Sequence, residues 1–127
     1  MFVGPVTFAE FVEYVVNKSS SGELLDPHWR PQHQLCHPCY VEYDFIGRFE
    51  NLKNDAKYAL SKLCARSRRN ITLPFVNAFE GRPASSYFAN VSHDIVRKLI
   101  RIYKVDYQLF GYDYRWATVA LPLFVES

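Results

Sequence analysis

The sequence DPHWRPQHQLCHPCYVEYDFIGRFE, residues 26–50, concentrates the chemistry of this chain of 127 residues. It holds three of the four histidines, two of the three cysteines, one of the two tryptophans and three of the seven prolines. Residues 24–38 are predicted to form a long ordered loop, because their prolines interrupt helices and central strands. A long loop that carries His, Trp and Arg side chains is more often functional than a simple connection.

The second half of this stretch alternates apolar and polar side chains and predicts a β-strand over residues 40–46. Val41, Tyr43 and Phe45 share one face of that strand, and Gly47 ends it. A single strand leaves its backbone groups without partners. Either other strands of this chain escape the pattern, or the remaining strands of the sheet lie on sequence outside it.

Three amphipathic helices are predicted around this stretch. Residues 7–16 begin with Thr-Phe-Ala-Glu, the spacing of a capping box, and continue with apolar residues at helical spacing. A second helix is expected over residues 50–65. A third begins at a cap formed by Ser92 or Asp94 and continues to about residue 110, where Gly111 ends it. The other segments, residues 17–22, 66–80 and 81–86, are predicted to be loops or extended chain.

The composition predicts one soluble, folded domain. Hydrophobic residues make up 49% of the chain and aromatic residues 17%, which supports a packed core. A net charge of +2 gives no reason to expect a nucleic-acid partner. No apolar run reaches the ~18–20 residues of a membrane span, and the N-terminus lacks the features of a signal peptide.

Three Asn-x-Ser/Thr triplets, at Asn17, Asn70 and Asn90, are potential glycosylation sites and favour a secretory lumen. A lumenal chain without a targeting segment is expected to be a fragment, and the odd number of cysteines agrees with that. One basic cluster is a candidate contact for an anionic partner, although a solvated helix end explains it as well. The cluster consists of Arg66, Arg68 and Arg69.

The sequence Cys36-His-Pro-Cys39 has three interpretations. A zinc site requires a second pair of ligands at the usual distance, and none follows. A redox motif requires the first cysteine at a helix N-terminus, whereas a strand is predicted after this pair. A small disulfide that fastens the loop to the strand is the favoured interpretation. Cys64 lies on the apolar stripe of its helix and is expected in the core.

The neighbouring residues His28, Trp29 and Arg30 also have two interpretations. They form either a packed aromatic side chain with satisfied polar neighbours or a surface that stacks a sugar or base ring and binds an anion. The residues themselves do not decide between the two.

Several motifs, in a fixed order, resemble the C-terminal half of the Golgi carbohydrate sulfotransferases. The likeness is strongest to the chondroitin and dermatan 4-O-sulfotransferases and the HNK-type glucuronyl sulfotransferase. It covers residues 6–112, whereas residues 113–127 form a divergent tail. The motifs are VTFAEF (6–11), DPHWRP (26–31), LCHPC (35–39), YDFIGRFENL (43–52), Asp55 and YKVDYQLFGY (103–112).

The resemblance implies an α/β, P-loop-like fold that binds 3′-phosphoadenosine 5′-phosphosulfate (PAPS) and transfers its sulfuryl group to a sugar hydroxyl. Such a fold holds the cofactor with a basic loop between a strand and a helix, and this chain contains no such loop. We therefore expect residues 1–127 to be a single partial domain, the mostly helical C-terminal portion of a sulfotransferase catalytic domain, inactive by itself.

The same resemblance implies a cellular location, an acceptor substrate and a set of residues that line a binding cleft. The complete protein is expected in the Golgi lumen as a single-pass type II membrane protein, with its anchor upstream of this chain. Its acceptor is expected to be a glycosaminoglycan or a glycoprotein glycan. His28, Trp29 and Arg30 are expected to line the cofactor or acceptor cleft, and no catalytic base is assigned. The alternatives are a non-catalytic glycan-binding module and a zinc or redox module built on Cys36 and Cys39.

Overall fold

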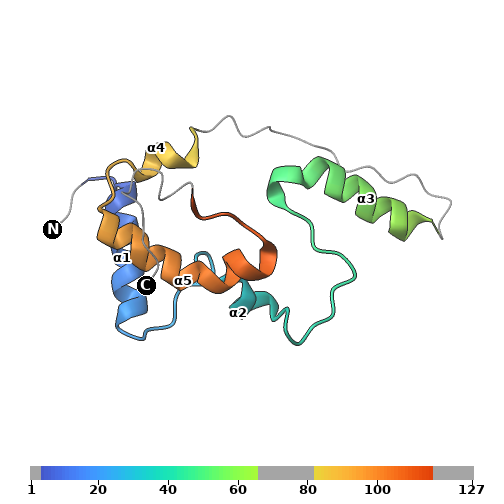
Figure 1. Cartoon of the computed structure of the whole chain (residues 1–127), viewed down its shortest axis with the longest axis horizontal. Coiled ribbons are helices and arrows are strands. Elements are labelled where there is room, and N and C mark those ends of the chain that lie inside the picture. The colour runs from blue at the N-terminus through green and yellow to red at the C-terminus, as the bar shows by residue number, and fades with distance from the viewer. Residues whose placement is uncertain (1–3, 66–81, 116–127) are drawn as a thin grey trace. The chain divides into compact units, whose positions relative to one another are not determined.

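The computed structural model of the chain describes residues 4–65 and 82–115, and every regular element in these ranges is helical (Figure 1). The described residues divide into two units. The first unit comprises residues 4–39 and 82–115, and the second comprises residues 40–65. The elements are α1 (Phe8–Ser20), α2 (Gln32–Cys36), the 3₁₀ helix η1 (Phe49–Asn51), α3 (Leu52–Cys64), α4 (Ala84–Phe88) and α5 (His93–Phe110).

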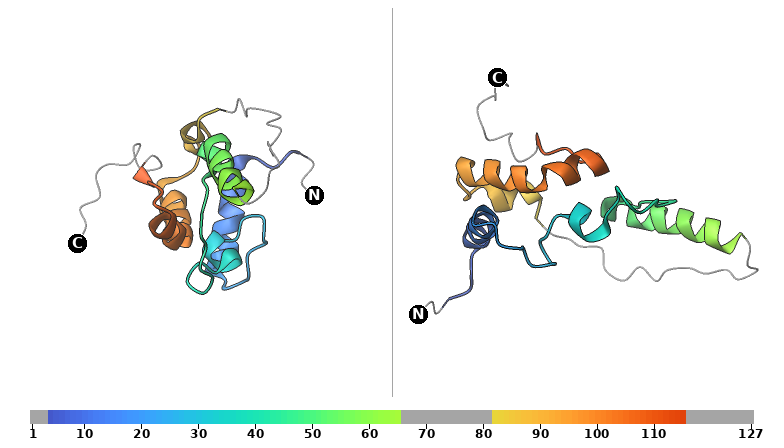
Figure 2. Two further views of the ribbon diagram at one scale, coloured as in Figure 1. Left: turned by 90° about the vertical axis from the view of Figure 1, so that its right-hand side faces the viewer. Right: turned by 90° about the horizontal axis from the view of Figure 1, so that it is seen from below.

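The first unit is built on the packing of α1 against α5. In the right-hand view of Figure 2, α1 is seen nearly end-on against α5, so the two helices cross. Val12 of α1 meets Val91 and Val96 at the centre of the contact, and each is at most 6% exposed. Burial of these side chains, at about 25 cal/mol per Å² of apolar surface, holds the crossing together. The partly buried neighbours are Ala9, Phe11, Phe88, Ile95, Leu99 and Ile100.

Both ends of α5 are where the sequence predicts them. The Ser92 hydroxyl accepts a hydrogen bond from the Ile95 N–H at 3.4 Å and caps the first turn. Gly111, with φ at 64°, ends the helix in the left-handed conformation, and the Tyr112 N–H donates to the Tyr107 carbonyl at 3.0 Å. None of the helices in the described part of the chain has the length and apolar character that crossing a membrane requires.

The start of α1 is also confirmed, but its end is later than predicted. The capping box is present, with the Thr7 N–H donating to Glu10 Oε2 at 2.8 Å and the Glu10 N–H donating to Thr7 Oγ1 at 3.3 Å. The helix continues one turn beyond residue 16, through polar residues that were predicted to form a loop. Ser20 Oγ donates to the Val16 carbonyl at 2.8 Å, so a local side-chain bond supports this last turn.

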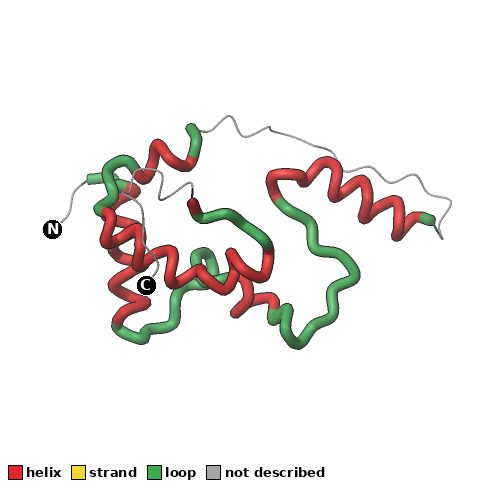
Figure 3. Tube along the Cα trace, viewed as in Figure 1, coloured by secondary structure: helices red, strands yellow, loops and turns green. Residues whose placement is uncertain are grey.

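The predicted strand over residues 40–46 is wrong. These residues form a loop, coloured green in Figure 3, and the described chain contains no strand. Because no described strand lies beside them, their backbone groups have no ladder to join. Val41, Tyr43 and Phe45 are 40–46% exposed, so the alternating face is only partly covered. The regular elements of the described residues are thus all helical, and the α/β class and P-loop-like fold remain predictions.

Two short helices, α2 and α4, occur where loops were predicted. Each begins directly after a proline, Pro31 for α2 and Pro83 for α4. A proline at the start of a helix costs no hydrogen bond, because the first N–H groups of a helix have no partner within it. α2 ends at His37, whose φ of 48° places it in the left-handed region before Pro38. The prolines therefore mark the limits of these helices and do not exclude them.

The second unit contains η1 and α3, which together match the helix predicted over residues 50–65. No residue of α3 is buried, although its apolar side chains recur at helical spacing. Cys64, expected in the core, is only partly buried.

Candidate functional site

The candidate site is a pocket of the first unit between the C-terminal half of α1 and the loop over residues 23–29. Its volume is about 310 Å³. A second, shallower pocket of about 500 Å³ adjoins it along α1 and shares Tyr14, Lys18 and Glu23 with it. The lining of the first pocket combines two aromatic rings, two carboxylates and one ammonium group. Its members are Tyr14, Lys18, Glu23, Leu24, Leu25, Asp26 and Trp29.

Trp29 lines this pocket and is also packed against α1. Its ring meets the rings of Phe11 and Tyr14 edge-on, with centroids at 5.3 Å and 6.4 Å. Its backbone N–H donates to the Asp26 carbonyl at 3.1 Å, which closes the turn that precedes it. Trp29 is half-buried, so one part of the indole ring supports the fold and another faces the pocket. The structure therefore shows the packed aromatic side chain, and the stacking of a ligand on Trp29 remains a prediction.

His28 lies beside the pocket and is held by a residue of the pocket wall. Asp26 Oδ1 accepts the His28 backbone N–H at 2.9 Å and lies 2.6 Å from the ring Nδ1. Two hydrogen bonds lower the pKa of the Asp26 carboxyl group: the larger effect comes from the His28 backbone N–H and the smaller from the His28 ring. The His28 side chain is 86% exposed, so the ring extends into solvent while Asp26 holds its backbone.

Arg30 has a structural role in the loop and does not line the pocket. Its Nε–H donates to the Leu25 carbonyl at 2.8 Å, and the side chain is half-buried. This bond closes the turn of residues 25–30 and holds Leu25 in the core, where it is 7% exposed. The structure thus places Trp29 in the pocket lining, whereas His28 and Arg30 are each hydrogen-bonded to a lining residue.

The charges of the pocket are two carboxylates, Glu23 and Asp26, against one ammonium group. Lys18 forms a short ion pair with Glu23, and this hydrogen bond raises the pKa of Lys18 and lowers the pKa of Glu23. The Lys18 Nζ also lies 6.0 Å from the centre of the Tyr14 ring, within the range of a cation–π contact. The pocket therefore disfavours a phosphate or sulfate group and suits the hydroxyl groups of a sugar ring.

α2, which follows the pocket loop, is attached to α5 by Asp106, a residue that the sequence analysis missed. Its carboxylate accepts the backbone N–H of Gln32 at 2.6 Å and of His33 at 2.9 Å, and it lies 2.7 Å from His33 Nδ1. Tyr103, one turn earlier, donates its hydroxyl to the Trp29 carbonyl in a short hydrogen bond. Burial raises the pKa of the Tyr103 phenol, which keeps it a donor.

The cysteine and metal predictions give no alternative site in the described residues. Cys36 and Cys39 are exposed thiols, so the structure lacks the predicted disulfide, and Cys36 Sγ lies 3.4 Å from Gln32 Oε1. The disulfide remains a prediction, because its formation depends on the redox state of the compartment. Residues 4–65 and 82–115 contain no group of three or more His, Cys, Asp or Glu side chains that could hold a metal ion.

The predicted glycosylation sites and the basic cluster are placed only in part. Asn17 is exposed on α1, where it borders the shallower pocket, and Asn90 is exposed in the turn before α5. The hydroxyl group of Ser92, the third residue of that triplet, is the cap of α5. The other predicted positions, Asn70, Arg66, Arg68 and Arg69, lie outside the described residues.

Comparison with known proteins gives a consistent result. The family model described as "Sulfotransferase family" matches residues 4–113. Carbohydrate sulfotransferase 11 of Danio rerio is 36% identical over 111 residues, which cover 85% of this chain and 31% of that protein. Carbohydrate sulfotransferase 12 of Mus musculus is 38% identical over 114 residues, and carbohydrate sulfotransferase 8 of Homo sapiens is 35% identical over 115. These alignments cover 84% and 85% of this chain and 26% of each of the two proteins.

The chain thus spans less than a third of the length of the curated relatives it matches. No solved structure matches its fold.

Proposed function

The chain belongs to the sulfotransferase family, and on that premise we propose that it supplies the acceptor-binding side of a carbohydrate O-sulfotransferase. The family match across residues 4–113 is the observation that carries this proposal. The complete enzyme would transfer a sulfuryl group from PAPS to a hydroxyl of a glycosaminoglycan or glycoprotein glycan. The named relatives, all carbohydrate sulfotransferases, support a carbohydrate as the acceptor.

The pocket beside Trp29 is the part of this chain that best fits a sugar. Aromatic rings stack on the apolar face of a pyranose, and carboxylates accept hydrogen bonds from its hydroxyl groups. Trp29 and Tyr14 supply the rings, and Glu23 and Asp26 supply the carboxylates. The same carboxylates oppose the phosphate and sulfate groups of PAPS, so the cofactor does not fit here. Its binding site is proposed to lie on the remainder of the enzyme.

His28 is proposed to accept the proton of the sugar hydroxyl. When the neutral ring donates its Nδ1–H to Asp26, the Nε2 atom has a lone pair and is available as a base. The exposed ring lies beside the proposed sugar pocket and is oriented by a residue of its wall. A histidine held by a carboxylate in this way is a common arrangement for general-base catalysis.

The fold and location of the complete protein follow the same proposal. Residues 1–127 would be a single partial domain that completes a P-loop-like fold together with the rest of the enzyme, and they would be inactive alone. The complete enzyme would lie in the Golgi lumen, anchored as a single-pass type II membrane protein. The share of each relative that is covered, 26–31%, supports the partial domain.

A chimera tests these roles. In it, this chain replaces the aligned 111 residues of Danio rerio carbohydrate sulfotransferase 11, and sulfate transfer from PAPS to desulfated chondroitin is measured. Trp29→Ala is expected to lower kcat/KM for the glycan by at least about tenfold, with the KM for PAPS unchanged. Trp29→Phe keeps a ring and should retain most of the activity. An unchanged kcat/KM in Trp29→Ala would refute the sugar pocket.

The role of His28 is tested in the same chimera. His28→Ala is expected to lower kcat about 10²–10⁴-fold. His93→Ala, at another exposed histidine of the first unit, is the matched control and should leave kcat unchanged. The isolated chain should show no transfer at all. Turnover by the isolated chain would contradict the partial domain, and glycan binding without transfer by the chimera would favour a binding module.

A further inference from the structure

The second unit has an apolar surface that its own described residues, 40–65, leave exposed. The side chain of Phe49 is 78% exposed, that of Leu52 47% and that of Tyr58 50%. The buried core residues of the described chain, Val12, Val15, Val16, Leu25, Val91 and Val96, all belong to the first unit. An isolated helix of 13 residues is only marginally stable in water unless an apolar face is packed. The second unit therefore needs a partner surface.

Part of this surface is a preformed groove with a volume of about 360 Å³. Its apolar lining is Phe45, Phe49, Leu52, Ala56 and Ala59. The Phe45 ring rests against Tyr58 of α3, with centroids 5.1 Å apart, and this contact fixes one wall of the groove.

Asp55 also fixes the groove. Its carboxylate accepts the Arg48 backbone N–H at 2.7 Å and the Asn51 side-chain amide at 2.6 Å, which fastens the loop to α3. At Gly47 a Cβ atom would lie 3.3 Å from the Asp55 Cβ, so the close approach of loop and helix favours glycine there. The groove is thus held by local contacts before any partner binds.

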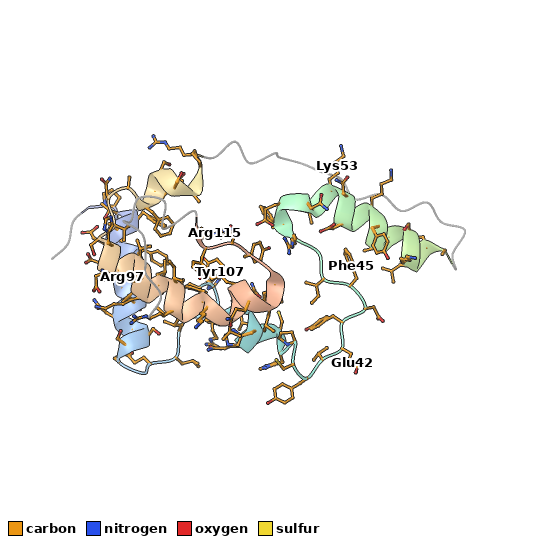
Figure 4. All side chains as sticks on the ribbon, in the orientation of Figure 1. Glu42, Phe45, Lys53, Arg97, Tyr107 and Arg115 are labelled. Atoms are coloured by element: carbon orange, nitrogen blue, oxygen red, sulfur yellow. The ribbon has the colours of Figure 1, made fainter. Side chains whose placement is uncertain are left out.

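The other side of α3 is polar. In Figure 4, Lys53 projects from the side of α3 that faces away from Phe45. Lys53 and Lys57 are exposed. One side of the helix is therefore suited to water and the other to an apolar partner, as in a helix at the surface of a larger domain.

We propose that this groove, together with Phe49 and Tyr58, is the docking surface for the portion of a carbohydrate sulfotransferase that lies outside the matched region. The surface lies within the family match over residues 4–113, so it belongs to the sulfotransferase domain and is not an appended module. More than two thirds of each relative lies outside the alignment, which is enough chain to cover it. The occupant would insert apolar side chains into the groove, and the inference rests on the proposed function.

Hydrogen exchange tests the docking surface. The probe is the chimera with Danio rerio carbohydrate sulfotransferase 11, compared with the isolated chain of 127 residues. The exchange rates of the amides of residues 52–64 are expected to be at least roughly tenfold lower in the chimera, because helix opening then requires undocking. Equal exchange rates in the two proteins would overturn the proposal. With the membrane anchor removed from both proteins, a chimera that is not secreted although the parent enzyme is secreted also counts against it, because a fitting surface permits folding.

A matched pair of substitutions locates the contact. Leu52→Glu on the groove is expected to reduce secretion of the chimera several-fold and to accelerate exchange over α3, with no effect on the isolated chain. Lys57→Glu, on the polar side, should change neither protein. Equal effects of the two substitutions would refute the proposal. Concentration-dependent dimerisation of the isolated chain that Leu52→Glu abolishes, without protection in the chimera, would instead identify a second copy as the occupant.

The docking surface and the proposed function have separate readouts. Protection of α3 in a chimera that transfers no sulfate would support the docking surface and contradict the activity. Sulfate transfer without protection would do the reverse.

Discussion

The helices α1 and α3 have the same length, 13 residues, and a similar periodic apolar pattern, but their environments differ. α1 buries Val12, Val15 and Val16, each at most 2% exposed, whereas α3 buries no residue. The pattern in both sequences predicts a helix and its apolar side, because helical periodicity is a local property. It does not predict what covers that side, because the partner is a tertiary property. In the described residues the apolar side of α1 is thus buried, whereas that of α3 is not.

The ends of the helices differ in the same way. In the first unit, α1 and α5 each begin with a hydroxyl side chain that accepts a backbone hydrogen bond. α3 has no side-chain cap at Asn51, and its start is held by Asp55, which reaches back to the loop. α1 and α5 thus have both local caps and a packed face, whereas α3 has only the loop contact. We expect substitutions in the two units to differ in effect accordingly.

The largest effect is expected from a charge placed in the packed helix. Val15→Lys is expected to cost at least about 3 kcal/mol of unfolding free energy, because a buried lysine without a partner must be desolvated or neutralised. Val15 is 1% exposed in the first unit. Urea unfolding followed by far-UV circular dichroism measures the change. A loss below about 1 kcal/mol would show that α1 is not packed as described.

A smaller effect is expected when the hydrogen bonds between Asp106 of α5 and the start of α2 are removed. Asp106→Ala leaves the backbone N–H groups of Gln32 and His33 without their acceptor and is expected to cost about 1–3 kcal/mol. Hydrogen exchange should increase most over residues 29–36. The matched substitution in the second unit, Asp55→Ala, should increase exchange at the start of α3 and leave the unfolding of the first unit unchanged. Equal changes in both units would remove the distinction between them.

The elements that the sequence predicts correctly are those with local signals. The capping box at Thr7, the cap at Ser92 and the stop at Gly111 each depend on residues within one turn of the chain. The resemblance to carbohydrate sulfotransferases is likewise confirmed, because it depends on ordered motifs. The strand over residues 40–46 is wrong because alternation alone does not supply a neighbouring strand. The last turn of α1 was missed because its support comes from serine side chains that also favour loops.

In the candidate site, too, the sequence predicts neighbours along the chain but not residues that only the fold brings together. His28, Trp29 and Arg30 were predicted because they are adjacent in one motif; of the three, Trp29 lines the pocket, and their role in a cleft remains a prediction. Tyr14 and Lys18 were missed because only the fold of the following loop brings them to Trp29. Asp106 was missed because it lies 73 residues from His33 in the sequence. The available signal was a carboxylate beside the predicted apolar stripe of α5, a place where a charged group requires a partner.

A weaker effect, dependent on pH, is expected at the exposed cap of α1. The hydrogen bonds from Thr7 lower the pKa of Glu10 in the folded state. A carboxyl group with a lowered folded pKa adds stability above its unfolded pKa, and that stability is lost as the pH falls through the folded pKa. The thermal midpoint should therefore fall less steeply below about pH 4 in Glu10→Gln than in the unsubstituted chain. Identical acid profiles would show that the capping box does not contribute.

The smallest effect is expected when a lysine, the residue that replaces Val15 in the first prediction, is introduced in the second unit. Leu63 is 73% exposed near the end of α3, so Leu63→Lys removes no packing in the isolated chain. A lysine near a helix C-terminus also interacts favourably with the helix dipole, and we expect a change below about 0.5 kcal/mol. Urea unfolding of Val15→Lys and Leu63→Lys side by side measures the contrast directly. A loss of more than about 1 kcal/mol in Leu63→Lys would show that α3 is already covered within this chain. The difference between α1 and α3 would then lie in how each is packed, and not in the absence of a partner.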